Sequence, residues 1–169
     1  MTSKKGYNIM QIVNLFGTKK ESPRLRQLKS LLLFETLNAK ELKIVDSLLH
    51  ERHYLKDEVI FDTGEEGQAL YIILQGKILI CHQGQGEAGK IAELEQGRLF
   101  GELALLDNFP RSTQTKALED SNLAVFFRDD FLGLLETHAV IASKISLQLA
   151  RHIGKRLRET VSSTGVRIE

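Results

Sequence analysis

The spacing of hydrophobic residues is helical over the first part of the chain. From about residue 23 to residue 51, apolar residues recur every three or four positions, which predicts two helices. Pro23 suits the first turn of one helix, and Asn38 followed by Glu41 approximates a capping box at the start of the next. The apolar positions of these two helices are Leu25, Leu28, Leu31 and Leu32, and then Leu42, Val45, Leu48 and Leu49.

From about Arg52 to Phe127 the apolar residues alternate with polar ones in short runs separated by glycines. Many short strands at roughly 8–12-residue spacing with glycine turns indicate a closed or sandwiched antiparallel sheet, and a jelly-roll barrel is the natural architecture. The predicted strands contain Val59 and Phe61; Leu70, Ile72 and Leu74; Ile78 and Ile80; Ile91, Leu94 and Leu99; Thr115 to Leu118; and Leu123 to Phe127.

Helical spacing returns after the last predicted strand. Arg128-Asp129-Asp130 places acids where the dipole of a starting helix favours them, and Phe131, Leu134 and Leu135 form its predicted buried stripe. A longer helix is expected from about Val140 to Val161. Its apolar side is wide, and a helix packed only on its own domain needs a narrower face, so we expect a coiled-coil homodimer. This side comprises Ile141, Ile145, Leu149, Ile153 and Leu157, widened by Leu147, Ala150 and Gly154.

The fold class predicted is therefore mainly β, an antiparallel jelly roll with N-terminal helices and a long C-terminal helix. We expect one domain over residues 23–162 and a tail over 163–169. We expect residues 1–22 to form an amphipathic arm, with apolar residues between Ile9 and Phe16. Two interpretations of the arm stay open. It is either a frayed terminus or a helix packed on its own domain, or it is a docking segment for a protein partner or a membrane surface. The weakly basic polar face makes the membrane the least favoured of these.

Charge and cysteine content narrow the class of protein. Among 169 residues, 23 basic and 22 acidic side chains nearly cancel, so no global field attracts nucleic acid or an acidic membrane. A single cysteine, Cys81, excludes an intramolecular disulfide and agrees with a reducing compartment. No run approaches the roughly 18 apolar residues of a membrane helix, and no signal peptide is expected. These features predict a cytoplasmic protein with no transmembrane segment.

Candidate chemistry gathers in residues 99–113. Gly101 lets the backbone approach a guest closely, and the first N–H groups of a short helix over Glu102 to Leu106 point outward as an anion site. Arg111 follows, and its planar guanidinium can make two parallel hydrogen bonds to a phosphate, with hydroxyls on Ser112 and Thr113 beside it. A carboxylate at Glu102 would repel phosphate but accepts hydrogen bonds from sugar hydroxyls. Phosphate, sugar and an apolar surround together indicate a nucleotide.

The motif Phe100-Gly101-Glu102-Leu103-Ala104-Leu105-Leu106 with Pro110-Arg111-Ser112-Thr113 closely resembles the phosphate-binding cassette of cyclic nucleotide-binding domains. That family includes the regulatory subunits of protein kinase A and the bacterial catabolite activator protein. The segment from Gly64 to Ile78 resembles the paired central strands of the family, and roughly residues 28 to 160 fit its pattern.

The resemblance implies a receptor for cAMP or cGMP that signals to a partner through its C-terminal helix, and no other cofactor. It implies Glu102 as acceptor of the ribose 2′-hydroxyl and a phosphate site at Arg111, against the plainer readings of a first-turn acid and a solvated turn arginine. Thr113, Gln114 and Thr115 depart from the commoner small or apolar residues, and Thr113 would crowd the pocket. The predicted ligand-binding residues are Phe100, Gly101, Glu102, Leu103, Ala104, Arg111, Ser112 and Thr113.

Other function classes find less support in the sequence. The five histidines form no metal-ligand pattern, and no nucleophile–base pair is evident, so neither a metal site nor an enzyme is expected. The basic C-terminal helix, including Arg151 and Arg156, fits a solvated helix end or a DNA-associated regulator, but too few residues follow Val161 for a DNA-binding module. A ligand-free interaction scaffold of the same fold remains the alternative.

Overall fold

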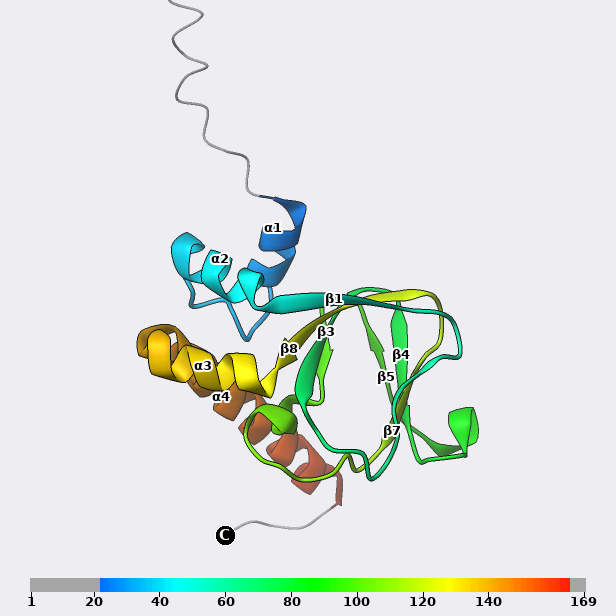
Figure 1. Ribbon diagram of the computed structural model, residues 1–169. Helices are drawn as coiled ribbons and strands as arrows, with labels where there is room; N and C mark the ends of the chain where they lie inside the picture. Colours follow the sequence, from blue (N-terminus) through cyan, green and yellow to red (C-terminus); the bar gives the residue numbers. More distant parts are fainter. Residues whose placement is uncertain (1–21, 165–169) are drawn as a thin grey trace, which may run out of the picture.

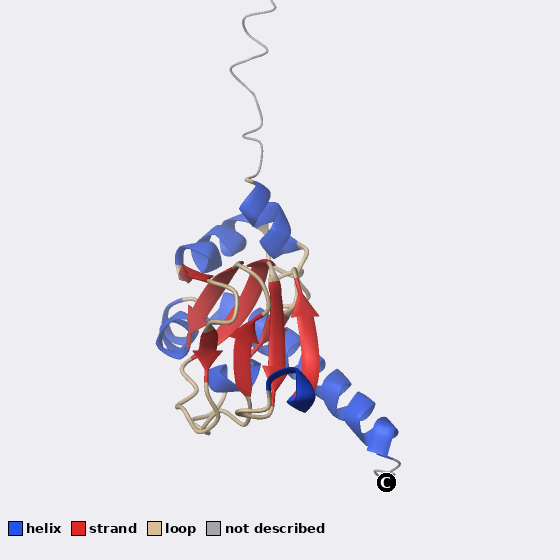
Figure 2. Cartoon of the chain, turned by 90° about the vertical axis from the view of Figure 1, so that its right-hand side faces the viewer, coloured by secondary structure: helices blue, strands red, loops and turns tan. Residues whose placement is uncertain are grey.

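The computed structural model describes residues 22–164, which form two four-stranded antiparallel sheets flanked by helices (Figures 1 and 2). The first sheet has the strand order β1-β8-β3-β6 and the second has the order β2-β7-β4-β5. Their bounds are β1 Leu49–Tyr54, β8 Ser121–Phe127, β3 Ala69–Gln75 and β6 Leu99–Phe100, then β2 Val59–Phe61, β7 Gln114–Ala117, β4 Lys77–Cys81 and β5 Lys90–Glu95. The predicted jelly roll is confirmed, as two facing sheets rather than a closed barrel.

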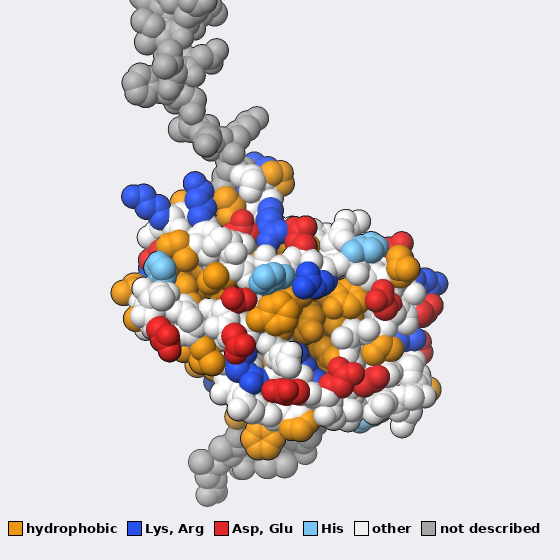
Figure 3. Space-filling model, viewed as in Figure 1, with side chains coloured by type: hydrophobic (Ala, Val, Ile, Leu, Met, Phe, Trp, Pro, Cys, Tyr) orange, Lys and Arg blue, Asp and Glu red, His pale blue; other side chains and the backbone are white. Residues whose placement is uncertain are grey.

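Each sheet buries one face in a shared core between them. Alternation along a strand sends successive side chains to opposite faces, so Ile73 and Leu123 of the first sheet meet Phe61 and Ile78 of the second. In the space-filling view (Figure 3), hydrophobic side chains are visible in the region that lies between the two sheets in Figure 1. The opposite face of the first sheet, including Ile72 and Phe126, packs on the helices in a second core.

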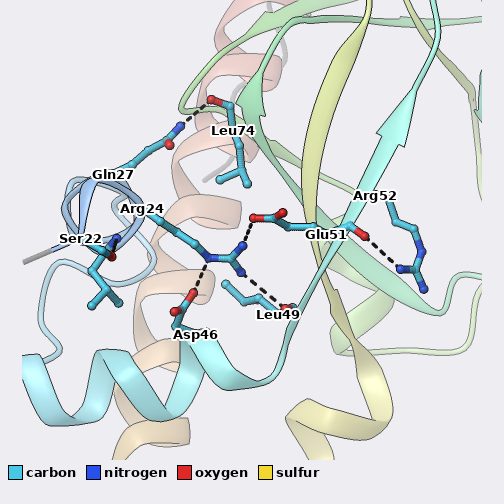
Figure 4. A network of polar contacts seen from close by, with 9 residues as sticks. Ser22, Arg24, Gln27, Asp46, Leu49, Glu51, Arg52 and Leu74 are labelled. Atoms are coloured by element: carbon cyan, nitrogen blue, oxygen red, sulfur yellow. Dashed lines mark hydrogen bonds and ion pairs between the residues drawn. The ribbon is translucent and has the colours of Figure 1, made fainter.

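Two N-terminal helices, α1 (Pro23–Lys29) and α2 (Ala39–Ser47), cover one end of the first sheet. The predicted capping box is confirmed: the Asn38 side chain accepts from the Glu41 N–H, and the Glu41 carboxylate accepts from the Asn38 N–H. Arg24 fastens α1 to its neighbours, with Nε 2.6 Å from Asp46 of α2 and an ion pair to Glu51 of β1 (Figure 4). These contacts fix α1 and α2 against the edge of the sandwich.

Three N-terminal expectations are corrected. Helix α1 ends at Lys29, so Leu31 lies in the following turn and Leu32 is 44% exposed instead of buried in a helix. Leu48 caps α2, and Leu49 begins strand β1 because its side chain enters the core from the sheet. A strand from residue 49 therefore precedes the predicted change of period at Arg52.

The chain ends in α3 (Arg128–Thr137) and the long α4 (Ala139–Thr164), which pack on the outer face of the first sheet. Leu135 of the predicted α3 stripe is 39% exposed, because α4 covers only the side of α3 that carries Phe131 and Leu134. Along α4 the predicted stripe divides. Ile141, Ile145 and Leu149 are buried in the domain's own core, whereas Leu157 is 56% exposed. The inner part of that stripe is therefore used within the domain.

Within residues 22–164, no helix is long and apolar enough to cross a membrane. Across the same residues, no group of three or more His, Cys, Asp or Glu side chains could hold a metal ion. The amphipathic arm lies outside the described residues except for Ser22, whose side chain accepts from the Leu25 N–H and so caps α1. The predicted tail also lies outside them, except that α4 continues to Thr164.

Candidate functional site

The cassette is a tight loop between the two sheets that runs from β6 to β7. Gly101 follows β6 and has a φ of 71°, and a four-residue 3₁₀ turn, η4, spans Glu102–Leu105. A Cβ on residue 101 would lie 2.7 Å from Nη1 of Arg111 and 3.2 Å from the Ala69 carbonyl oxygen. Only glycine fits both the backbone conformation and the space. The group that lies close to Gly101 is Arg111 of the same chain, and the predicted approach of a ligand to this position stays a prediction.

The backbone of Arg111 is tied to the loop between β2 and β3. Its N–H donates to the Glu65 carbonyl at 2.7 Å, and its own carbonyl accepts from the Gly64 N–H at 2.8 Å. The preceding Pro110 forms an isolated bridge with Glu66. These bonds fix the second end of the cassette at the mouth of the sandwich.

Backbone and aromatic groups also hold the guanidinium of Arg111 in place. Nη2 donates to the Ala69 carbonyl at 2.8 Å, and Nη1 donates to the Gly101 carbonyl at 3.3 Å. The guanidinium carbon lies 4.2 Å from the centre of the Phe61 ring and 5.8 Å from that of Tyr71, which are cation–π distances. The side chain is thus oriented by the protein alone.

The positive charge of Arg111 has no carboxylate partner within the described part of the chain. None of the ion pairs formed by residues 22–164 includes it, and its Nε is buried with no hydrogen-bond acceptor in that part of the chain. Burial lowers the pKa of the guanidinium, and this is opposed in part by nearby Tyr71 and Glu65. A part-buried cation in a cavity wall that forms no ion pair among residues 22–164 is a candidate site for an anion.

Glu102 faces the C-terminal helix. Its side chain is 5% exposed and forms an ion pair with Arg156 of α4, while Nε2 of His152 lies 3.8 Å from the same oxygen. Burial lowers the pKa of His152, partly opposed by the negative charge of Glu102. A carboxylate of the cassette therefore holds α4, in a contact the sequence reasoning missed. A signal existed, because Arg156 lies seven residues after the buried Leu149 and so on the inward face of the helix.

A second link joins the cassette to the C-terminal helices. Arg128, the first residue of α3, donates from Nε to the Ala104 carbonyl at 2.6 Å. Its other guanidinium nitrogens donate to the Gly67 carbonyl and the Asn108 side chain. One side chain thus ties the start of α3 to the cassette and to the loop before β3.

The cassette lines a cavity of about 410 Å³ between the sheets. All eight sequence-predicted site residues contribute to its wall, which brings them together around one space. The Ala104 N–H donates to the Gly101 carbonyl and so is not available to a ligand. Of the N–H groups predicted to point outward from this turn, those of Glu102 and Leu103 remain. Lining residues that were absent from the prediction are Phe61, Ile80, Ile91, Ala92, Asp107, Phe109, Pro110, Thr115 and Arg156.

A sandwich with a cavity of mixed apolar and polar lining, and in its wall a fixed arginine that forms no ion pair among residues 22–164, has the features of a binding domain for a small anionic ligand. A family model described as the cyclic nucleotide-binding domain matches residues 51–138. The chain belongs to this family.

Curated relatives support the same assignment. The chain is 38% identical over 129 residues to the cyclic AMP receptor protein of Thermus thermophilus, covering 75% of this chain and 57% of that protein. It is 33% identical over 119 residues to a cAMP-dependent protein kinase regulatory subunit of Mycosarcoma maydis, covering 63% and 23%. The chain thus spans less than two thirds of the length of these relatives.

Among solved structures, the Thermus thermophilus catabolite activator protein superimposes with a TM-score of 0.70 and 34% sequence identity. The match covers 79% of this chain and 62% of that one. The arrangement of sheets and flanking helices is therefore that of a cyclic nucleotide-binding domain.

Proposed function

We propose that this chain is a receptor for a cyclic nucleotide such as cAMP, and that the ligand's phosphate binds at Arg111. The observation that carries the proposal is the part-buried guanidinium, which donates to two carbonyls, has a buried Nε without an acceptor and forms no ion pair among residues 22–164. A phosphate oxygen would supply the missing acceptor at Nε and the missing negative charge. The N–H groups of Glu102 and Leu103, at the start of η4, are the further donors we assign to the phosphate.

The cavity supports a ligand over an empty scaffold. Its volume of about 410 Å³ falls in the range usual for small-molecule sites, about 300–1,000 Å³, so Thr113 narrows the space without filling it. The names of the relatives describe a receptor and a regulatory subunit, which supports a binding role over a catalytic one.

We assign the ribose 2′-hydroxyl to Glu102, and the signal to α4. The Glu102 carboxylate forms an ion pair with Arg156, so a ribose hydroxyl that binds the same oxygen would compete with the helix. A ligand shifts a conformational equilibrium only by its difference in affinity for the two states, and this competition supplies such a difference. Arg128 adds a mechanical link between the cassette and the start of α3.

We further propose that a second copy of the chain packs on the outward face of α4. Val140 and Leu147 are 67% and 54% exposed, and Gly154 follows at the same seven-residue interval. A seven-residue repeat keeps a seam turned toward a parallel partner helix, and the small Ala150 and Gly154 let the two backbones approach. The homodimer thus rests on the side of α4 opposite to Ile141 and Ile145.

Isothermal titration calorimetry of the purified chain with cAMP, and then with cGMP, tests the receptor proposal. A saturable isotherm with one nucleotide per chain supports it and sets the base preference. A flat trace with both nucleotides, from protein that unfolds cooperatively, contradicts it and favours the scaffold.

A further inference from the structure

Four side chains form a continuous row across the inner face of the second sheet. Phe61 of β2 is paired with Thr115 of β7, Thr115 with Ile80 of β4, and Ile80 with Ala92 of β5. Residues directly opposite each other in antiparallel strands project on the same face. All four line the cavity, so the row forms one wall, roughly 14 Å wide for four strands at their usual spacing.

Thr115 supplies the only hydroxyl in this otherwise apolar row. Its side chain is fully buried, and its Oγ1 has no hydrogen-bond partner among residues 22–164. A buried hydroxyl without a partner loses its hydrogen bonds to water and gains nothing in return. An unpartnered polar atom in the wall of a binding cavity is explained if the ligand is its partner.

The position of Thr115 in the row indicates which part of the ligand it meets. Arg111, to which we assign the phosphate, lies over Phe61 at one end of the row. Beyond Thr115 the wall continues with Ile80 and Ala92, which are apolar and offer no partner to a charged group. A nucleobase has apolar faces that suit such a wall and polar edge atoms that suit a single hydroxyl.

We propose that the Thr115 hydroxyl hydrogen-bonds to an edge atom of the nucleobase and so contributes to the choice between bases. This inference rests on the proposed function, because it assumes a nucleotide with its phosphate at Arg111. A hydroxyl both donates and accepts, so its effect depends on which polar atoms a given base presents at that edge.

The test compares Thr115→Val, which removes the hydroxyl at nearly constant shape, with Thr115→Ser, which keeps it. Without ligand, we expect Thr115→Val to melt at or above the wild-type temperature, because no hydrogen bond of the protein is lost. With ligand, we expect it to weaken binding of the preferred nucleotide about five- to tenfold, the effect of one hydrogen bond. The ratio of the dissociation constants for cAMP and cGMP should change by at least about threefold, and Thr115→Ser should keep the wild-type ratio.

Each other outcome has a defined meaning. A melting temperature of Thr115→Val lowered by more than about 4 °C would assign the hydroxyl a structural partner and overturn the inference. Unchanged affinities of Thr115→Val for both nucleotides would also overturn the inference. Equal losses of affinity for both nucleotides would overturn it too, because they would place the contact at the phosphate or ribose, which the two nucleotides share. Wild-type protein that binds neither nucleotide overturns the proposed function together with this inference, which distinguishes that failure from the others.

Discussion

Replacing Arg156 by alanine would free the carboxylate of Glu102, and the size of the effect follows from the burial of the pair. The Glu102 side chain is 5% exposed, whereas that of Arg156 is 57% exposed. Breaking a fully buried ion pair costs about 3–5 kcal/mol, and an exposed pair contributes at most about 1 kcal/mol. For a pair with one solvated partner, we expect Arg156→Ala to lower the free energy of unfolding by about 1–2 kcal/mol.

The same substitution should strengthen nucleotide binding. If the ribose hydroxyl binds Glu102 as proposed, it competes with Arg156 for one carboxylate oxygen, so the free energy of the Arg156–Glu102 ion pair opposes nucleotide binding. Removing Arg156 should therefore make the free energy of nucleotide binding more favourable by about 1–2 kcal/mol, which corresponds to a dissociation constant about 5 to 30 times smaller. The variant is therefore expected to be less stable and to bind more tightly.

Denaturant unfolding and calorimetric titration with cAMP measure the two effects of Arg156→Ala. The matched control is Lys155→Ala, which removes an adjacent side chain that is 70% exposed and lies 3.8 Å from Glu159. A second ligand, 2′-deoxy-cAMP, lacks the hydroxyl assigned to Glu102 and should gain little affinity from the substitution. Unchanged or weaker cAMP binding by Arg156→Ala would refute the competition, and an equal gain for the deoxy ligand would refute the ribose assignment.

Two further predictions concern α4. Burial holds the pKa of His152 below its ordinary value of 6.5, so the folded state disfavours its protonation and the free energy of unfolding should fall as the pH drops below 6.5. His152→Gln should remove this part of the loss when unfolding is measured at a series of pH values. The same pH dependence in the variant and the wild type would contradict this prediction. Light scattering at micromolar concentration should give a dimer mass for the wild type and a monomer mass for Leu147→Glu. The control Leu132→Glu, on α3, should keep the dimer mass, and a monomer mass for the wild type would refute the α4 interface.

Local signals in the sequence were sufficient for much of the fold and for the cassette. The capping box at Asn38 and Glu41 is formed by neighbouring residues, so its spacing alone predicts it. The eight predicted cassette residues surround one cavity because they come from two short segments, 100–104 and 111–113, which lie at the two ends of one loop. Leu49 was misplaced because an apolar residue at a helical interval fits equally well as the first buried residue of a strand.

Contacts between distant segments could not be predicted in this way. Arg156 meets Glu102 across 54 positions, and only the docking of α4 on the first sheet brings them together. The wall containing Ile80 and Thr115 depends on strand order and register, which a one-dimensional pattern does not specify. The division of the α4 apolar side likewise depends on how the helix is rotated against the domain. Ile145 turns inward and Leu147 outward, although both appear in the same apolar band.

The central claim is that Arg111, which forms no ion pair among residues 22–164, binds the phosphate of a cyclic nucleotide, and titration of Arg111→Ala with cAMP tests it most directly. Arg98→Ala is the control, because Arg98 lines an adjacent hollow and is not part of the wall of the cassette cavity. We predict that Arg111→Ala folds cooperatively and binds cAMP more weakly by about 2–5 kcal/mol, the scale of removing one partner of a buried charge pair, while Arg98→Ala keeps wild-type affinity. Wild-type affinity in folded Arg111→Ala would contradict the account.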